Sequence, residues 1–256
     1  MNILEAAILG LVQGLTEFLP VSSSGHLAIA ENLFGLKGDS NLFFIVMLHL
    51  ASLAAIVVYY WHNFLKLFTT NRYEIGYIVV GSIPAAIIGL LFKRQIEATF
   101  EDVVLVSLFL CVTGIFLFIA DRLSRERVEL REAGILRIII IGIAQAVAIL
   151  PGISRSGSTI GSGFLTGIKR TDAVRFSFFL GAPAIFGAGI LTLKDAIDHK
   201  VTVDFLPILI GMGIAFFVSL LSIRLVELVA QKNKFRIFAF YCLVVGLTAF
   251  VYFMLI

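Results

Sequence analysis

Long apolar stretches separated by short polar segments dominate the chain. Six of them have the length of a helix that crosses a bilayer, which needs roughly 20 residues. These six stretches cover residues 41–61, 73–92, 103–120, 173–193, 205–228 and 235–256. The pattern therefore predicts an all-α integral membrane protein with six transmembrane helices.

Two further apolar stretches, residues 2–19 and 135–150, are shorter, and each ends in a proline followed by small polar residues. The first break reads Pro-Val-Ser-Ser-Ser-Gly from Pro20, and the second reads Pro-Gly-Ile-Ser-Arg-Ser-Gly from Pro151. Proline and a serine-glycine cluster stop a helix. Backbone freed in this way is tolerated at membrane depth only inside protein or beside a water-filled cavity. We therefore predict two re-entrant helix-loop-helix hairpins instead of two more spans.

The two predicted hairpins resemble each other when aligned at a constant offset along the chain. The matched pairs, in order, are Gly10 and Gly142, Gln13 and Gln145, Ser22 and Ser154, Ser24 and Ser156, Gly25 and Gly157, Gly35 and Gly167, and Lys37 and Lys169. Three spans, an odd number of crossings, separate the hairpins, so they open on opposite faces. This predicts one membrane domain made of an inverted-topology repeat, residues 1–120 and 133–256, as in inverted-repeat transporters. The alternative is coincidence in apolar sequence.

Composition and charge agree with a membrane location. The chain is 59% hydrophobic and 14% charged, with a mean hydropathy of +1.02. A formal charge of +3 is too small to predict a nucleic-acid partner. The face of the first hairpin holds five basic residues, namely Lys37, Lys93, Arg94, Lys194 and Lys200. The opposite face holds thirteen, namely Lys66, Arg72, Arg122, Arg125, Arg127, Arg131, Arg137, Lys169, Arg170, Arg175, Lys232, Lys234 and Arg236.

Basic residues concentrate on the cytoplasmic side of membrane proteins. The face with thirteen of them is therefore predicted to be cytoplasmic. Both termini and the first hairpin are then expected on the extracytoplasmic side of the plasma membrane.

Ionisable residues at membrane depth are candidates for function because burying them is costly. Glu17 lies beside the first proline break, and Gln13 lies on the same helical face four residues earlier. A carboxylate and an amide oxygen at this spacing can hold a divalent cation, and Glu17 alone can act as a general base. A buried structural carboxyl is the alternative. His49, in the stretch 41–61, either lines the same cavity or bonds a neighbouring helix.

The first break also carries hydroxyls and a histidine. Ser22, Ser23 and Ser24 can bind phosphate oxygens, and Ser22 or Ser23 can also serve as a nucleophile. His26 can attack phosphorus or shuttle a proton. Helix capping by a serine, with a satisfied polar histidine beside it, is the alternative for this segment.

The second break supplies a cation. Arg155 has a permanent charge and a planar set of donors that suits phosphate. Hydroxyls and flexible backbone surround it, from Gly152, Ser154, Ser156, Gly157, Ser158 and Thr159. A helix that starts here would point its positive end at the same anion. Pairing with Glu17 alone is the alternative for Arg155.

These two segments resemble the signature regions of the undecaprenyl-diphosphatase family, the bacitracin-resistance type. The first runs from Gln13 through Glu17, Pro20 and Ser22 to His26, and the second from Pro151 through Arg155 to Thr159. The resemblance implies hydrolysis of a C55 polyprenyl pyrophosphate to the monophosphate carrier and phosphate, which recycles the carrier for cell-wall synthesis. It also implies a divalent cation, Mg²⁺ or Ca²⁺, and a link to bacitracin.

Site residues follow from the resemblance position by position. The family's acidic motif, Glu or Gln followed four residues later by Glu, falls on Gln13 and Glu17, which are expected to bind the metal. The histidine falls on His26, the serine-arginine motif on Ser154, Arg155 and Thr159, and Ser23 matches a serine also proposed to act. Expected catalytic residues are Glu17, His26, Arg155 and Ser23. Expected substrate-binding residues are Ser22, Ser24, Ser154, Ser156, Thr159 and Gly152.

The expected partners are the polyprenyl pyrophosphate, the lipid bilayer and a second copy of the chain, with no nucleic acid. The main alternative function is a transporter or flippase of phosphate or of the polyprenyl monophosphate, because inverted repeats with broken helices are typical of transporters.

Overall fold

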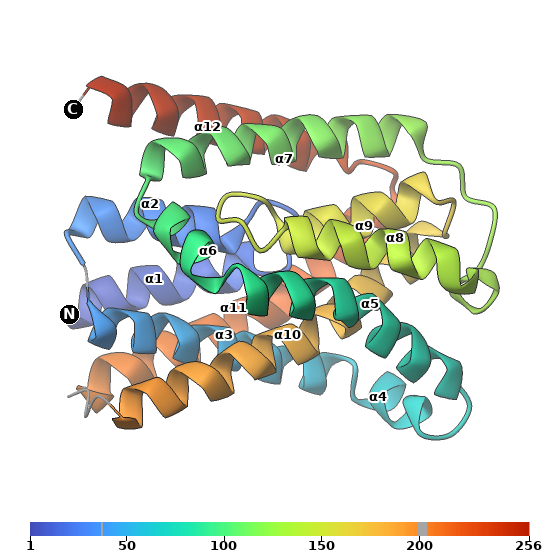
Figure 1. Ribbon diagram of the computed structural model, residues 1–256, viewed down its shortest axis with the longest axis horizontal. Coiled ribbons are helices and arrows are strands. Elements are labelled where there is room, and N and C mark those ends of the chain that lie inside the picture. The colour runs from blue at the N-terminus through green and yellow to red at the C-terminus, as the bar shows by residue number, and fades with distance from the viewer. Residues whose placement is uncertain (37, 199–203, 256) are drawn as a thin grey trace.

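The computed structural model describes residues 1–36, 38–198 and 204–255, and long helices running along one axis make up most of it (Figure 1). Six of them are long and apolar enough to cross a membrane, as predicted. They are α3 (Asp39–Tyr59), α5 (Arg72–Leu91), α7 (Val103–Leu123), α10 (Arg170–Asp198), α11 (Phe205–Gln231) and α12 (Arg236–Leu255). The prediction of an all-helical integral membrane protein is confirmed.

Four shorter helices form two sequential pairs. They are α1 (Ile3–Thr16) with α2 (Ser23–Phe34), and α8 (Gly134–Val147) with α9 (Arg155–Leu165). Both pairs break at the predicted prolines. The connecting segments contain α4 (Trp61–Leu67), α6 (Lys93–Phe100) and the 3-10 turn η1 (Leu130–Glu132).

The two short pairs approach each other from opposite ends of the bundle (Figure 1). The outer ends of α1 and α2 lie at the same end as both chain termini. The outer ends of α8 and α9 lie at the other end, and the two turns point toward the middle. Sequence-distant polar turns are thereby brought to one depth in the bundle.

Glycines allow the half-length helices to pack closely on long ones. A Cβ added at Gly10 of α1 would lie 2.5 Å from the carbonyl oxygen of Gly211 of α11, and one added at Gly142 of α8 would lie 2.6 Å from that of Gly81 of α5. Any larger residue would force these backbones apart.

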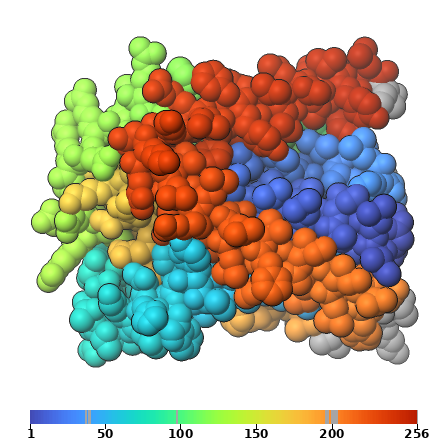
Figure 2. All heavy atoms as spheres, turned by 180° about the vertical axis from the view of Figure 1, so that it is seen from behind, coloured from blue at the N-terminus to red at the C-terminus, as the bar shows by residue number. Residues whose placement is uncertain are grey.

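Seen from behind, α1 reaches the surface between α11 and α12 (Figure 2).

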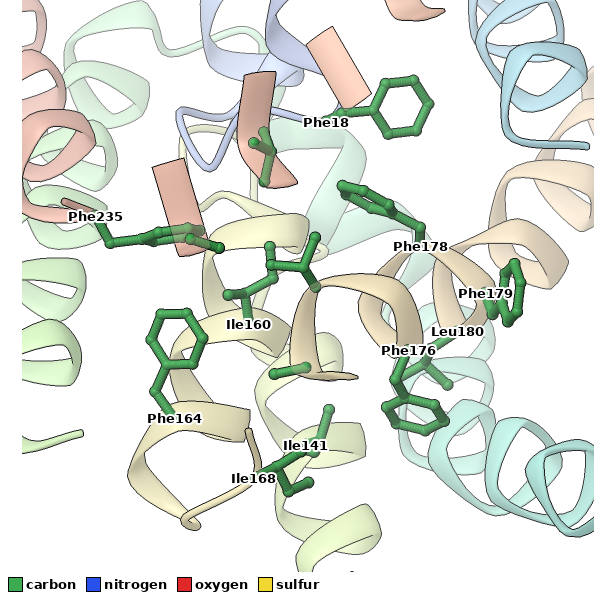
Figure 3. Close-up of a cluster of buried hydrophobic side chains, with 14 of the residues drawn as sticks. Phe18, Ile141, Ile160, Phe164, Ile168, Phe176, Phe178, Phe179, Leu180 and Phe235 are labelled. Atoms are coloured by element: carbon green, nitrogen blue, oxygen red, sulfur yellow. The ribbon is translucent and has the colours of Figure 1, made fainter. Parts of the chain in front are cut away.

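A cluster of buried aromatic and aliphatic side chains packs inside the bundle, with members on α9 and α10 (Figure 3). Phe18, which follows Glu17 directly, packs edge-on against Phe178 of α10 with ring centroids 5.2 Å apart. Phe164 of α9 packs in the same way on Phe235 at 5.0 Å. These aromatic contacts fix both short helix pairs against the long helices, and so they fix the depth of the polar turns between them.

Ion pairs concentrate at the end of the bundle where α8 begins. Arg170 binds Asp121 at 2.6 Å, and Arg236 approaches the other carboxylate oxygen of Asp121 at 3.2 Å. At the surface, Lys169 donates to Glu129 at 2.7 Å, and this hydrogen bond lowers the pKa of Glu129. Of the basic residues counted in the sequence, Lys37 and Lys200 lie outside the described residues.

Candidate active site

The turn between α1 and α2 is built around Ser22. Its side-chain oxygen accepts a hydrogen bond from the backbone N–H of Gly25 at 3.2 Å and contacts the Ser24 hydroxyl at 3.2 Å. It therefore caps the start of α2. Ser22 adopts φ 69°, in the left-handed region that favours glycine. Strain of this kind is retained where the surrounding structure enforces it, often at functional sites.

The turn between α8 and α9 repeats this cap. Ser154 accepts from the N–H of Gly157 at 3.0 Å and contacts Ser156 at 3.3 Å. Thr113 of α7 secures the turn from outside, because its hydroxyl donates to the carbonyl of Gly152 and accepts from the N–H of Ser154, both at 3.0 Å. Gly152 has φ 92°, and an added Cβ would lie 2.3 Å from the carbonyl oxygen of Val106. Only glycine fits this position.

The two turns touch each other. The Ser156 hydroxyl of the second turn donates to the carbonyl of Leu19 in the first at 3.0 Å. A Cβ added at Gly25 would lie 3.1 Å from the Cα of Gly152. Five residues that were predicted to bind substrate thus build and join the turns, namely Ser22, Ser24, Ser154, Ser156 and Gly152. The hydroxyls of the four serines are mostly engaged in hydrogen bonds within or between the turns.

Glu17 is the centre of a buried hydrogen-bond cluster (residue exposure 5%). One carboxylate oxygen accepts from the Arg155 guanidinium at 2.5 Å. The other oxygen accepts from the Ser23 hydroxyl at 2.7 Å and from the amide of Gln13 at 3.0 Å. Three of the predicted site residues, which come from both helix pairs, therefore surround the carboxylate of a fourth.

Helix α10 holds Arg155 from the far side. The guanidinium approaches the carbonyl oxygen of Ser177 at 3.5 Å. It lies over Gly181, where an added Cβ would fall 1.7 Å from an arginine nitrogen. Thr159 bonds the Ser177 hydroxyl at 2.6 Å and the carbonyl of Arg155 at 2.9 Å. Thr159 therefore lies beside the arginine, as predicted, while the contribution of α10 was not predicted.

Helices α3 and α11 complete the cluster with residues that the motifs did not identify. His49 places Nε2 3.5 Å from Glu17. Ser52 accepts from Gln13 at 3.4 Å and from Ser219 of α11 at 3.0 Å. His49 and Ser52 are three residues apart and so share a helical face. This spacing of two polar residues in an apolar stretch could have been found in the sequence. For Ser219, no signal in the sequence pointed to the site.

His26 has different partners. Its Nδ1 lies 2.8 Å from the carbonyl oxygen of Ser22, and its Nε2 lies 2.9 Å from the hydroxyl of Tyr241 on α12. The two rings also stack, with centroids 5.6 Å apart and planes 8° apart. Among the described residues, no hydrogen bond or ion pair joins His26 to Glu17 or Arg155. Tyr241 was not predicted.

A cation would have to be held by a mixed set of ligands. Within residues 1–36, 38–198 and 204–255, no cluster of three or more His, Cys, Asp and Glu side chains is suited to a metal ion. The predicted pair does carry an unused ligand atom, because the Oε1 of Gln13 is buried and has no hydrogen-bond partner among the described residues. The amide Nε2 faces the Glu17 carboxylate, and rotation of the amide by 180° would place the oxygen there, where it could bind a hard divalent cation together with the carboxylate.

Known proteins resemble this chain over nearly its whole length. The family model for the bacitracin resistance protein BacA matches residues 6–248. An undecaprenyl-diphosphatase of Halothermothrix orenii is 40% identical over 253 residues, which cover 96% of each chain. One of Methanobrevibacter smithii is 39% identical, covering 98% of this chain and 97% of its own. With a family model that spans nearly its whole length and relatives this similar, the chain belongs to the BacA family.

Proposed function

We propose that this protein is a membrane phosphatase that hydrolyses undecaprenyl diphosphate to the monophosphate carrier and inorganic phosphate. The relatives named undecaprenyl-diphosphatase support the substrate and the reaction. One observation carries the proposal: Arg155, Glu17 and Ser23 are joined by consecutive hydrogen bonds of 2.5 and 2.7 Å in a buried site. An anion clamp, a base and a hydroxyl nucleophile are the groups that phosphoryl transfer needs.

Arg155 binds the pyrophosphate. Its guanidinium presents several N–H donors in a plane, which matches phosphate oxygens, and it begins α9, whose N-terminal backbone dipole also favours an anion. The contacts with Ser177 and Gly181 hold the group in place before substrate arrives. Preorganised charge of this kind is a large contributor to catalysis, because it is not reoriented during the reaction.

Ser23 attacks the terminal phosphorus. Its Oγ forms the new P–O bond, its proton passes to Glu17, and the bond from phosphorus to the bridging oxygen breaks, releasing the polyprenyl monophosphate. Water then hydrolyses the phosphoserine to inorganic phosphate and restores the hydroxyl. Ser23 is preferred to His26 as the nucleophile because Ser23 bonds Glu17 directly, whereas His26 is held by Ser22 and Tyr241. His26 remains the candidate acid-base group.

Gln13 and Glu17 hold the divalent cation of the reaction. When bound, the cation would neutralise charge on the pyrophosphate. The buried, unpartnered Oε1 of Gln13 supports this assignment. A glutamine supplies one neutral ligand where a glutamate would supply a charged one, so the affinity should be modest.

We also propose that the short helix pairs are re-entrant hairpins of an inverted repeat. The packing supports this, since α1 rests on α11 and α8 on α5 through glycines. The offset that aligns Gly10 with Gly142 relates α1 to α8 and also carries α5 onto α11. The excess of basic residues at the α8 end supports a cytoplasmic location for that end. The first hairpin and both termini then face the extracytoplasmic side of the plasma membrane.

The test is phosphate release by the purified full-length protein in detergent with undecaprenyl diphosphate, with and without a chelator. We expect Glu17→Ala and Arg155→Ala each to lower the rate at least 100-fold, on the order of the loss of a charge-stabilising group. Lys169→Ala, which removes an exposed ion pair, is the matched control and should retain the rate. Normal hydrolysis by both site variants would exclude the assignment.

A transporter or flippase is the second candidate, favoured by the opposed helix pairs. Detergent solution has no compartments, so phosphate release there requires an enzyme. Transport of phosphate or polyprenyl monophosphate in vesicles, without release in detergent, would favour the transporter.

A further inference from the structure

His49 lies on α3, outside both signature segments, yet its ring faces the proposed catalytic carboxylate. We propose that His49 is a third protein ligand of the cation held by Gln13 and Glu17, and that its imidazole shifts the metal preference of the site from Mg²⁺ and Ca²⁺ toward transition ions. The inference rests on the proposed function and deepens it by naming a ligand and a class of metal.

The orientation of the His49 ring is the first argument. Its Nδ1 lies 2.9 Å from the carbonyl oxygen of Ile45. A carbonyl only accepts hydrogen bonds, so Nδ1 carries a proton. In the neutral ring, Nε2 therefore keeps its lone pair. Histidines that bind metals usually donate their other ring N–H to a carbonyl or carboxylate, which fixes the tautomer, and His49 has this arrangement.

The contact between His49 and Glu17 is the second argument. The Nε2 lies 3.5 Å from a Glu17 oxygen, longer than the usual 2.7–3.2 Å of an N–H···O hydrogen bond. A lone pair and a carboxylate oxygen that face each other repel unless a positive charge lies between them, and the Arg155 guanidinium lies on the other oxygen of Glu17. A cation that both atoms bind, or a proton on the ring, satisfies that requirement, and the experiment below separates the two.

The amide of Gln13 supplies the remaining ligand. Its Nε2 lies 3.0 Å from the same Glu17 oxygen and 3.4 Å from Ser52, while its buried Oε1 lacks a partner among the described residues. Rotation of the Gln13 side-chain amide by 180° exchanges the positions of Oε1 and Nε2. The oxygen then lies beside Glu17, and the Ser52 hydroxyl can donate to it. Neighbouring ligands of an octahedral ion with bonds of about 2.1 Å lie about 3.0 Å apart, which agrees with the spacing of Gln13 and Glu17.

The chemistry of this ligand set decides the metal. Mg²⁺ and Ca²⁺ prefer ligand sets made entirely of oxygen, whereas imidazole nitrogen suits transition ions such as Zn²⁺, Fe²⁺ and Ni²⁺. Mn²⁺ has the lowest affinity of that series and serves below as its paramagnetic probe. The His49 side chain is 25% exposed, whereas that of Glu17 is only 4% exposed, so this ligand can be reached from outside the cluster. An ion bound beside Glu17 can keep open positions for the phosphate oxygens of a substrate.

The test uses purified full-length protein, stripped of metal in detergent and loaded with Mn²⁺. Pulsed electron paramagnetic resonance detects the nuclear coupling of an imidazole nitrogen bound to Mn²⁺. We expect this signal in the natural protein and its loss in His49→Gln, which keeps a polar side chain of similar reach. The Kd for Mn²⁺ should rise about 10- to 100-fold, as for other losses around a metal site, while the Kd for Mg²⁺ changes less than threefold.

His62→Gln, which alters an exposed histidine on α4, is the control and should keep the signal. Thermal unfolding of His49→Gln checks that the variant is folded. Mn²⁺ binding that depends on Glu17 but gives no imidazole signal would overturn the role of His49 and leave the cation of the proposed function intact, as expected for a protonated ring paired with Glu17. Absence of Mn²⁺ binding, with hydrolysis insensitive to chelators, would overturn both.

Discussion

The helix pairs α1–α2 and α8–α9 share a backbone plan but differ in charge. In each, a 14-residue helix ends before a proline, and a serine caps the next helix by accepting from a glycine N–H three residues later. In each, the capping serine contacts a second serine, at 3.2 Å in the first turn and 3.3 Å in the second. This backbone structure therefore requires serine, proline and glycine at fixed positions, independently of which catalytic side chains the turn contains.

The side chains proposed to act in catalysis occur where the pairs differ. When the capping serines of the two turns are aligned, Glu17 corresponds to Ile149, Ser23 to Arg155, and His26 to Ser158. The proposed base and nucleophile thus belong to one turn and the proposed phosphate clamp to the other. Neither turn alone contains all three groups, so the proposed mechanism requires contact between the turns.

The strongest test of this comparison replaces the first residue of the second helix in each pair. Arg155→Ala should lower kcat about 1,000-fold, and Ser23→Ala about 100-fold, because one removes the phosphate clamp and the other the proposed nucleophile. Ser24→Ala, which removes a neighbouring hydroxyl that contacts Ser22, should change the rate by a few-fold at most. The measurement is steady-state phosphate release from undecaprenyl diphosphate.

If Ser24→Ala were as damaging as Ser23→Ala, the hydroxyls would serve the turn and not the reaction. Trapping of a phosphoserine after rapid acid quenching, present in the natural protein and absent in Ser23→Ala, gives an independent check.

A smaller effect is expected at His26, where the second pair has Ser158 in place of a histidine. Tyr241→Phe removes the hydroxyl that lies 2.9 Å from Nε2 of His26 and keeps the stacked ring. We expect kcat to fall about tenfold with KM nearly unchanged, since Tyr241 positions His26 and is assigned no contact with phosphate. Tyr252→Phe, at an exposed position of the same helix, is the control. A change confined to KM would instead assign Tyr241 to substrate binding.

The smallest effect concerns the matched glutamines. Gln145 is buried, and both polar atoms of its amide lack partners among the described residues, whereas Gln13 bonds Glu17. A buried polar group without partners destabilises a protein by about 1–3 kcal/mol. Gln145→Leu should therefore raise the free energy of unfolding by about 1 kcal/mol without loss of activity. Gln13→Leu should instead lower activity and cation affinity.

Denaturant unfolding in detergent and the hydrolysis assay measure both variants. Loss of activity in Gln145→Leu would show that the second glutamine has a functional partner, and the contrast between the pairs would then be wrong.

Most of the architecture could be predicted from the sequence, because membrane spans depend on length and apolarity alone. The breaks at Pro20 and Pro151 were also predictable, since proline and serine-glycine runs act locally. The contact of Glu17 with Arg155 follows once both turns reach the middle of the bundle. These features need no knowledge of side-chain packing.

The residues that were missed are those placed by tertiary packing. Tyr241 belongs to the last helix, and nothing in its neighbourhood distinguishes it from Tyr252. Gly181 matters only because the Arg155 guanidinium lies above it. Ser23 and His26 are three residues apart in one motif, yet the structure turns them toward different partners. Sequence identified the motif but not the direction of each side chain.

The close contact of Gly10 with Gly211 has a consequence for biosynthesis. The helix that carries Glu17 at its end leaves the ribosome well before α11, the helix on which it rests. During translation, α1 is therefore synthesised without this packing partner. Synthesis of α11 then determines when the turn that carries Glu17 can reach its final position, and truncation before α11 should leave an inserted but inactive polypeptide.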